Sequence, residues 1–220
     1  MAKKNEISIR CTECGKPFTT DSYALVNVGT DPELKDKVRD GSLFVRECPY
    51  CGARNLVRSQ TVYHDPEGKL MVWLLPEGAI PESSVSALEA ALVADGAALE
   101  GYELRRVGDV GSLIEKVNIR EAGLEDTVVE MCKYVTRMEL SEKDPAHEAE
   151  LMDAPLKFYR MEGADNTLIF SYPMEGKMHG VSVGFNVYED CRGILGRNPS
   201  VKAPGGFARI DAEWIGRFFR

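Results

Sequence analysis

Two short cysteine motifs constrain this chain more than any other feature of its sequence. They are Cys11-Thr12-Glu13-Cys14 and Cys48-Pro49-Tyr50-Cys51, and a glycine, Gly15 or Gly52, follows each one directly. Glycine adopts positive φ at little cost, so each motif can form a tight turn whose backbone N–H groups point back at the sulfur atoms. Two such turns supply the four thiolates of a closed, tetrahedral structural zinc site. The pattern therefore predicts a metal site and gives little indication of a reaction.

Other interpretations of the cysteines are redox dithiols, two disulfides and unrelated core residues. A thioredoxin-type dithiol opens a helix after a strand, whereas these pairs lie between short extended runs such as Ile7-Ser8-Ile9. Disulfides need an oxidising compartment, and the first five residues contain no apolar signal segment. We favour zinc, with iron as the main other metal for four sulfur ligands. The predicted ligands are Cys11, Cys14, Cys48 and Cys51.

A helix is predicted between the two motifs. Cys14 and Cys48 are separated by 33 residues, and a compact four-cysteine site needs only about 15 to 20. Among the extra residues, Asp31-Pro32-Glu33-Leu34 provides an N-cap, a proline at the first helical position and an acidic first turn. Gly41 is a residue at which this helix can end. With the flanking extended runs, the region up to about Val62 is predicted to be a small β unit that metal binding helps to fold.

The composition is that of an ordinary globular protein, with 44% hydrophobic and 28% charged residues. No apolar run approaches the ~20 residues of a membrane span, and no targeting segment is evident, so we expect a cytoplasmic protein without a membrane partner. The net charge of −8 argues against a general nucleic-acid binder. Residues 1–60 carry ten Lys or Arg and eight Asp or Glu, a balance of +2 that leaves −10 for the remainder.

A β-hairpin is predicted over residues 61–76. Two apolar runs flank Asp65-Pro66-Glu67-Gly68, which has proline at the second turn position and glycine at the fourth, as a type I turn prefers. The second run, Leu70 to Leu75, is continuously apolar, so we expect both of its faces to be covered.

At this point the chain resembles the CpXC domain family. The resemblance rests on the two Cys-x-x-Cys-Gly motifs, on Asp31-Pro32-Glu33-Leu34 between them, and on Tyr63-His64-Asp65 before an apolar strand that ends in proline. It covers about residues 7 to 140. Thr12 departs from the family pattern, in which proline usually follows the first cysteine, but all four sulfur positions are kept. The family is defined by its cysteine pairs and has no assigned biochemical function, so the resemblance implies the metal and supplies no substrate.

Three amphipathic helices are predicted after the hairpin. They begin near Pro81, Asp109 and Leu124 and end near Gly96, Ile119 and Met138. A short strand around Tyr102 and Leu104 separates the first two. We expect these helices to pack with the hairpin, which gives an α+β fold.

The acidic stretch after the third helix is predicted to separate two domains. The expected organisation is a zinc-ribbon and helical domain over 1–140, an acidic linker over 141–155 and a C-terminal antiparallel β region with a terminal helix over 156–220. In that last region, the alternating residues Val181, Val183, Phe185 and Val187 predict a strand, and the apolar residues from Phe207 to Phe218 predict the terminal helix.

Few residues suggest catalysis. His64 lies beside Asp65, but neighbours in a strand point to opposite faces, so one cannot easily orient the other. Asp65 is expected to cap the turn instead. His179 is expected in a loop, Cys132 in an apolar stripe, and Cys191 nearer the surface, with polar neighbours. The sequence therefore predicts neither catalytic nor cofactor-binding residues.

Three functions are compatible with these patterns. The favoured one is a structural zinc protein whose ribbon is an interaction surface for a protein partner or for self-association. The second is a nucleic-acid-binding zinc ribbon, supported by the basic residues around the motifs, which are Arg10, Lys16, Arg46, Arg54 and Arg58. The third is an enzyme with a pocket near His64 or His179.

Overall fold

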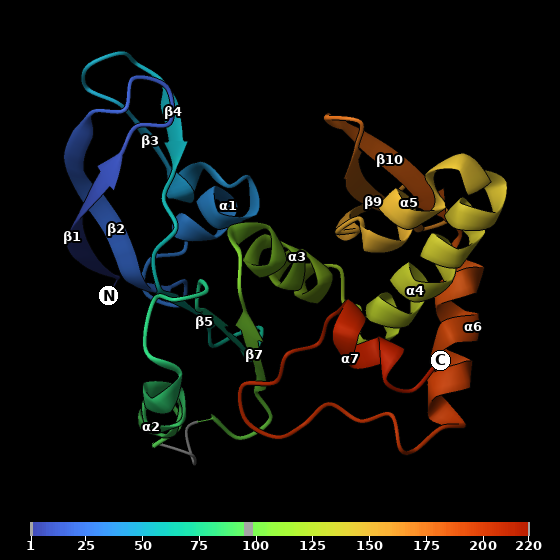
Figure 1. The fold of residues 1–220 in the computed structure, drawn as a ribbon. Helices are drawn as coiled ribbons and strands as arrows, with labels where there is room; N and C mark the ends of the chain where they lie inside the picture. The colour runs from blue at the N-terminus through green and yellow to red at the C-terminus, as the bar shows by residue number, and fades with distance from the viewer. Residues whose placement is uncertain (1, 95–98, 220) are drawn as a thin grey trace. The chain divides into compact units, whose positions relative to one another are not determined.

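The computed structural model describes residues 2–94 and 99–219 and divides the chain into two compact units (Figure 1). Unit 1 comprises Met1–Ile114 and Gly205–Ala208, and unit 2 comprises Glu115–Pro204 and Arg209–Arg220. Both units contain helices and strands, which confirms the predicted α+β class. The predicted domain boundaries at 140 and 155 stay a prediction.

Unit 1 is built on a mixed five-stranded sheet with the order β1-β2-β5-β6-β7. Its strands are β1 (Lys3–Arg10), β2 (Pro17–Asn27), β5 (Thr61–Asp65), β6 (Leu70–Leu74) and β7 (Glu103–Val107). Successive neighbours alternate between antiparallel and parallel pairing. The first cysteine motif lies in the connection between β1 and β2.

The predicted hairpin is strands β5 and β6. Their antiparallel register pairs Tyr63 with Val72, and the Asp65 side chain accepts a hydrogen bond from the Gly68 N–H at 2.8 Å. Asp65 therefore caps the turn, as predicted. Every residue of β6 is buried, and Trp73 is 0% exposed, because both faces of this interior strand are covered.

A distant segment of the chain completes this sheet. Ala208 forms a parallel bridge with Arg105 at the edge of β7, and its carbonyl accepts from the Arg106 N–H at 3.0 Å. The neighbouring Phe207 packs edge-on against Trp73, with ring centroids 5.8 Å apart. The helix predicted from Phe207 to Phe218 is therefore wrong in its extent. Only α7 (Ala212–Gly216) is helical, because Asp211 caps it by accepting from the Trp214 N–H.

The ribbon comprises residues 10–16, which hold the first cysteine motif, and the part of unit 1 between β2 and β5, which holds the second. It contains α1 (Leu34–Arg39), the 3-10 turn Ser42–Phe44, and the antiparallel strands β3 (Val45–Glu47) and β4 (Arg54–Leu56). Helix α1 confirms the predicted insertion, and its Leu34 and Val38 are buried. Helix α2 (Glu82–Leu92) also belongs to unit 1 and lies after the hairpin, as predicted.

Unit 2 combines helices with an antiparallel sheet of order β10-β9-β8, as expected for the C-terminal region. Its strands are β8 (Lys157–Glu162), β9 (Thr167–Met174) and β10 (Lys177–Val183). Its helices include the end of α3 (Val110–Glu121), α4 (Asp126–Lys143), α5 (Glu148–Asp153), α6 (Phe185–Gly196) and α7. Among the described residues, no helix is long and apolar enough to cross a bilayer.

Two features of unit 2 differ from the sequence prediction. The alternating run ends at Val183, and Phe185 and Val187 belong to helix α6, in which the Phe185 ring stacks on Tyr188 one turn later. Gly184 stands between the strand and the helix. Most of residues 141–155 is helical as well, since α4 runs to Lys143 and α5 begins at Glu148 after the Asp144-Pro145 break.

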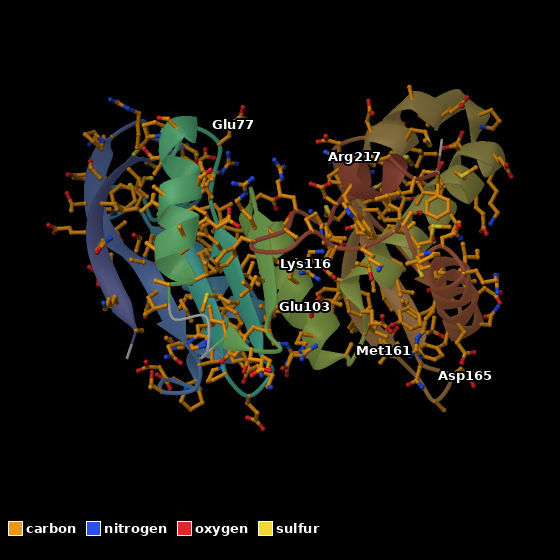
Figure 2. All side chains as sticks on the ribbon, turned by 90° about the horizontal axis from the view of Figure 1, so that it is seen from below. Glu77, Glu103, Lys116, Met161, Asp165 and Arg217 are labelled. Carbon is orange, nitrogen blue, oxygen red and sulfur yellow. The ribbon has the colours of Figure 1, made fainter. Side chains whose placement is uncertain are left out.

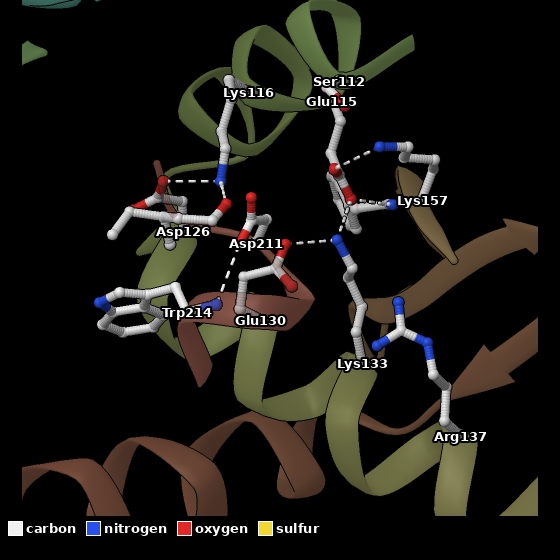
Figure 3. Close-up of polar contacts among 12 residues, drawn as sticks. Ser112, Glu115, Lys116, Asp126, Glu130, Lys133, Arg137, Lys157, Asp211 and Trp214 are labelled. Carbon is white, nitrogen blue, oxygen red and sulfur yellow. Dashed lines mark hydrogen bonds and ion pairs between the residues drawn. The ribbon is translucent and has the colours of Figure 1, made fainter. Parts of the chain in front are cut away.

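Buried charges fill part of the interior of unit 2 (Figure 3). The Lys133 ammonium contacts Glu115 at 3.0 Å and Glu130 on its own helix, and all three side chains are at most 4% exposed. Lys116 donates to Asp126 at 2.8 Å and to the Ile210 carbonyl at 2.8 Å. Helices α3 and α4 are therefore joined by ion pairs.

The charges in this network stabilise one another's ionised forms. Burial raises the pKa of Glu115, but Lys133, Lys157 and Lys116 outweigh it and, with the Phe158 N–H, hold the pKa below its usual 4.5. Burial lowers the pKa of Lys133, but Glu115 and Glu130 outweigh it and raise the pKa above 10.5. Because each charge has a partner, burial does not neutralise the pair.

Candidate metal centre

The two cysteine motifs form equivalent turns. In the first, the Gly15 N–H donates to the Cys11 carbonyl at 3.0 Å, and in the second the Gly52 N–H donates to the Cys48 carbonyl at 2.9 Å. Both glycines have positive φ, 69° and 74°. This conformation is the one that L side chains rarely adopt, which explains the glycine after each motif.

The turns bring all four sulfur atoms together. The Sγ atoms of Cys11 and Cys51 are 3.6 Å apart, those of Cys14 and Cys48 are 3.7 Å apart, and all four lie within 4.8 Å of one another. A disulfide would require about 2.05 Å, so no disulfide is closed here. A tetrahedron with metal–sulfur bonds of about 2.3 Å has edges of about 3.8 Å. The cluster fits the predicted metal site and can hold one ion.

The surroundings of the cluster are apolar on the inside. Cys11 and Cys48 are each 2% exposed and pack with the buried Phe18, against which Ile9 and Ala53 also lie. Cys51 is exposed. The site therefore sits at the edge of a small core, with one side toward solvent.

Backbone N–H groups reach the sulfur atoms. Hydrogen bonds from the backbone of Cys14 and then Glu13 lower the pKa of the Cys11 thiol to about 6, although burial opposes them. The Ala53 N–H acts in the same sense at Cys51, but burial and the other three thiols outweigh it and raise the pKa of Cys51 to about 12. Without a cation, the cluster therefore favours a single thiolate, because each further thiolate would repel it. A bound cation removes that repulsion, so its binding releases protons.

Asn55 is a residue of this site that the sequence analysis did not identify. It lies on β4, is 3% exposed, and its side-chain oxygen accepts from the Thr12 N–H at 2.9 Å. Its amide nitrogen donates to the Ala53 carbonyl at 2.8 Å. Asn55 therefore connects the two motifs, and no sequence spacing signals this role, because it lies 43 positions after Thr12.

The sequence model of the CpXC protein family matches residues 9–133, which is more than half of the 220-residue chain and includes all four cysteines. The chain belongs to the CpXC family. The match lies within the range of about 7 to 140 that the motifs indicated and ends inside α4. Comparison with curated proteins and with solved structures finds no match.

A groove of about 670 Å³ lies beside the ribbon of this CpXC protein. Leu56, at the end of β4, lines it together with Leu74, Pro76 and Val110. Leu56 is 47% exposed, although it is a large apolar side chain. Glu77, at the rim, points outward (Figure 2). The lining of the groove is mixed, because Arg58, Glu77 and Asp109 line it as well, and Leu74 and Val110 are buried whereas Leu56 is exposed.

The two candidate histidines lie in different units. His64 lies in unit 1, where its Nε2 is 3.1 Å from the Tyr102 hydroxyl, and burial lowers its pKa although Asp65 opposes this. Asp65 instead pairs with Lys35 at 3.0 Å. His179 lies in unit 2 and stacks on Tyr172. Neither histidine lines the groove.

The two cysteines outside the cluster are both buried in unit 2. Cys132 on α4 is 0% exposed, as its apolar stripe indicated. Cys191 on α6 is 2% exposed, so it does not lie nearer the surface, as its polar neighbours had indicated.

Proposed function

We propose that this chain is a zinc protein whose four-cysteine ribbon is a binding surface for another protein. The proposal that the chain binds a metal ion rests on the cluster of four sulfur atoms, which lie within 4.8 Å of one another. Four soft thiolates in a tetrahedral arrangement suit zinc or iron. Zinc sites of this kind are structural, because no coordination position is left for water or substrate.

The size of the ribbon supports a structural role for the ion. Strands β3 and β4 have three residues each, and the apolar cluster at the sulfur atoms has three buried members among the described residues, two of which are Cys11 and Cys48 themselves. So small a core contributes little free energy of folding by itself, and metal binding is then coupled to folding. The same proposal places the chain in the cytoplasm, where thiols stay reduced and can bind metal.

Elemental analysis of the purified chain, with a thermal melt in the presence and absence of a strong chelator, tests the metal proposal. One zinc per chain and a lower melting temperature with chelator are expected. Iron in place of zinc would overturn the metal assignment. Absence of any metal would overturn the structural role and leave redox chemistry at the two cysteine pairs as the explanation of the motifs.

The groove beside the ribbon supports a protein partner. Leu56 exposes nearly half of its surface next to the apolar Leu74 and Pro76, so a partner side chain seated there would remove apolar surface from water. Anchors of this type carry most of the affinity in protein interfaces. The proposal includes self-association, in which the partner is a second copy of this chain.

The basic residues of the ribbon are largely engaged within the chain, which gives less support to nucleic-acid binding. Arg46 donates to the carbonyls of Asp21, Leu43 and Val45. Arg10 donates to the Gly15 carbonyl, and the Lys16 ammonium lies over the Tyr50 ring at 5.0 Å. Three of the five cations considered for phosphate contacts therefore already have partners.

Site-specific photo-crosslinking tests the partner class. A photoreactive residue replaces Leu56 in one variant and Tyr159 in a control, because both side chains are about half exposed but only Leu56 lines the groove. A protein adduct formed at position 56 and absent at position 159, with a dose-dependent loss when the purified partner competes, supports the proposal. Adducts to RNA or DNA that weaken steeply with salt would overturn it in favour of nucleic acid.

A further inference from the structure

A short segment from the end of the chain covers one edge of the five-stranded sheet. Strand β7 is the last strand in the sheet order, and Ala208 forms its bridge with Arg105 of this strand. The segment Gly205–Ala208 belongs to unit 1, although the residues on either side of it belong to unit 2. In Figure 1 this segment, drawn in red, runs beside β7. A piece of chain that is distant in the sequence therefore occupies the edge of the sheet.

Backbone hydrogen bonds hold the segment in an extended, parallel arrangement. The Ala208 N–H donates to the Leu104 carbonyl at 3.2 Å, and the Ala208 carbonyl accepts from the Arg106 N–H at 3.0 Å. The Phe207 N–H donates to the Glu89 carboxylate of α2 at 2.8 Å. Main-chain bonds at a sheet edge are the source of affinity when a protein recognises a peptide by β-strand addition. The segment is thus bound as such a peptide would be.

An aromatic side chain anchors the segment. Phe207 is 3% exposed, and its ring meets the fully buried Trp73 edge-on. Both belong to an apolar cluster that includes Val62 of β5 and Val85 of α2. A large side chain seated in an apolar cluster supplies much of the affinity of a peptide interface. The site therefore selects an aromatic residue at this position.

The residues on either side of Phe207 are restricted to small ones. Gly206 has φ +72°, and a Cβ there would lie 2.6 Å from the Glu89 carboxylate oxygen that accepts from the Phe207 N–H. Glycine is the residue that adopts this conformation at little cost. Ala208 is 4% exposed, so a larger side chain there has little room. The segment that fits has glycine, an aromatic residue and a small residue in that order.

The connection that leads to the segment is exposed and lies outside the family domain. None of residues 198–206 is buried. The CpXC family match ends at residue 133, so it includes β7 and not the segment. Local opening takes place where few apolar groups are buried. The segment can therefore leave the edge of β7 while the sheet stays folded.

We propose that the edge of β7 and the cluster around Trp73 form a binding site for an extended segment of a partner protein. Residues 205–208 occupy this site within the chain until the partner displaces them. The partner segment carries the same order of glycine, aromatic and small residue, and it competes with a ligand whose tether gives it a high effective concentration. The site uses none of the residues that line the groove at Leu56 and none of the metal ligands, so it does not rest on the proposed function.

Fluorescence anisotropy of a labelled synthetic peptide of residues 202–210, added to the full chain, tests the proposal. Gly206→Ala in the chain weakens the docking of its own segment and leaves the site intact. The peptide should bind this variant about 5-fold to 30-fold more tightly than the unaltered chain, which corresponds to a cost of about 1 to 2 kcal/mol for the left-handed alanine. Gly205→Ala is the matched control and should bind the peptide as the unaltered chain does, because a Cβ there meets no atom within 4 Å.

The same substitution should act in the opposite direction when it is made in the peptide. A peptide with Gly206→Ala, or with Phe207→Ala, should bind the chain more weakly than the original peptide. The proposal is wrong if the Gly206 and Gly205 variants of the chain show the same peptide binding, or none. It is also wrong if the Phe207→Ala peptide binds as well as the original. A dimer of the unaltered chain that the peptide dissociates would assign the site to a second copy and overturn the assignment to another protein.

Hydrogen exchange of the unaltered chain gives a test that needs no variant. The amides of Arg106, Phe207 and Ala208 should lose protection well before the amides of β6, because the segment leaves while the interior strands stay paired. Loss of protection at a single common rate would show that the segment is released only when the sheet unfolds. That result would make the segment a permanent part of the fold and refute the proposal.

Discussion

The side-chain amide of Asn55 donates a hydrogen bond to the Cys11 sulfur at 3.7 Å. The same side chain accepts from the backbone N–H and the hydroxyl of Thr12. One residue on the second half of the ribbon thus fixes the first cysteine motif and donates to one of its sulfur atoms. Outer partners of metal ligands commonly affect affinity by orienting the ligand and by stabilising its charge.

Replacement of Asn55 by alanine should therefore weaken metal binding without removing a ligand. We expect a loss of about 10-fold to 100-fold in metal affinity, the range typical of such outer partners. Competition with a chromogenic chelator measures it. Asn5→Ala is the matched control, because Asn5 is an exposed residue of β1. Equal affinities for the Asn55 and Asn5 variants would show that the amide has no role in metal binding.

Loss of one sulfur ligand should have a different effect from loss of a buried thiol elsewhere. Cys51→Ser removes a member of the four-sulfur cluster and should abolish stoichiometric metal binding, and the ribbon should unfold at lower denaturant concentration. Cys132→Ser changes a buried thiol of unit 2 and should leave the metal content intact. Elemental analysis of both variants distinguishes these outcomes, and equal metal loss in the two would contradict the assignment of Cys51.

The glycine pair after Pro204 offers a matched test of how the distant segment joins unit 1. Gly206 has φ +72°, and a Cβ there would lie 2.6 Å from the Glu89 carboxylate, which accepts from the Phe207 N–H at 2.8 Å. Gly206→Ala should cost about 1 to 2 kcal/mol from the left-handed backbone alone. Gly205→Ala meets no atom within 4 Å and should cost far less. Urea denaturation compares them, and similar midpoints would refute this account of Gly206.

The local features of unit 1 were predictable because they depend on residues close together in the sequence. Cys-x-x-Cys-Gly motifs, the Asp65–Gly68 turn and the proline and glycine around α1 each determine a short piece of backbone. Asn55 and the Phe207–Trp73 contact were not predictable, since they join residues that only the tertiary fold brings together.

In unit 2 the periodicity itself was misleading. The alternation from Val181 to Val187 continues past Gly184, where β10 has ended and α6 begins. The pattern therefore predicted a strand for residues that form the start of a helix. On α4, Lys133 and Arg137 are buried although both are charged. Charged residues are rarely buried without partners. Single-sequence patterns therefore assign them to the surface. Distant partners, such as Glu115 for Lys133 and the Ala154 carbonyl for Arg137, cannot be recognised in advance.

The buried pair of Lys133 and Glu115 leads to a prediction about stability. Lys133→Met leaves Glu115 and Glu130 as buried carboxylates without their shared ammonium group. Removal of one partner of a buried ion pair costs about 3 to 5 kcal/mol. Lys143→Met is the control, because its pair with Glu139 at 3.6 Å is solvent-exposed and such pairs contribute at most about 1 kcal/mol. Equal free energies of unfolding for the two variants would show that the buried pair contributes no more than a surface one.

The same pair predicts how stability depends on pH. The folded-state pKa of Glu115 lies below 4.5, so its contribution to stability is complete above that pH and is lost as the pH falls through the lowered folded value. The pKa of Lys133 is raised, so its contribution is complete below pH 10.5 and is lost as the pH rises through the raised folded value. Free energies of unfolding, measured by urea denaturation from pH 3 to pH 7, should therefore fall toward acid. Glu115→Gln should make this dependence shallower, because its side chain does not titrate. An unchanged acid slope in that variant would mean that other carboxylates determine the acid sensitivity of the fold.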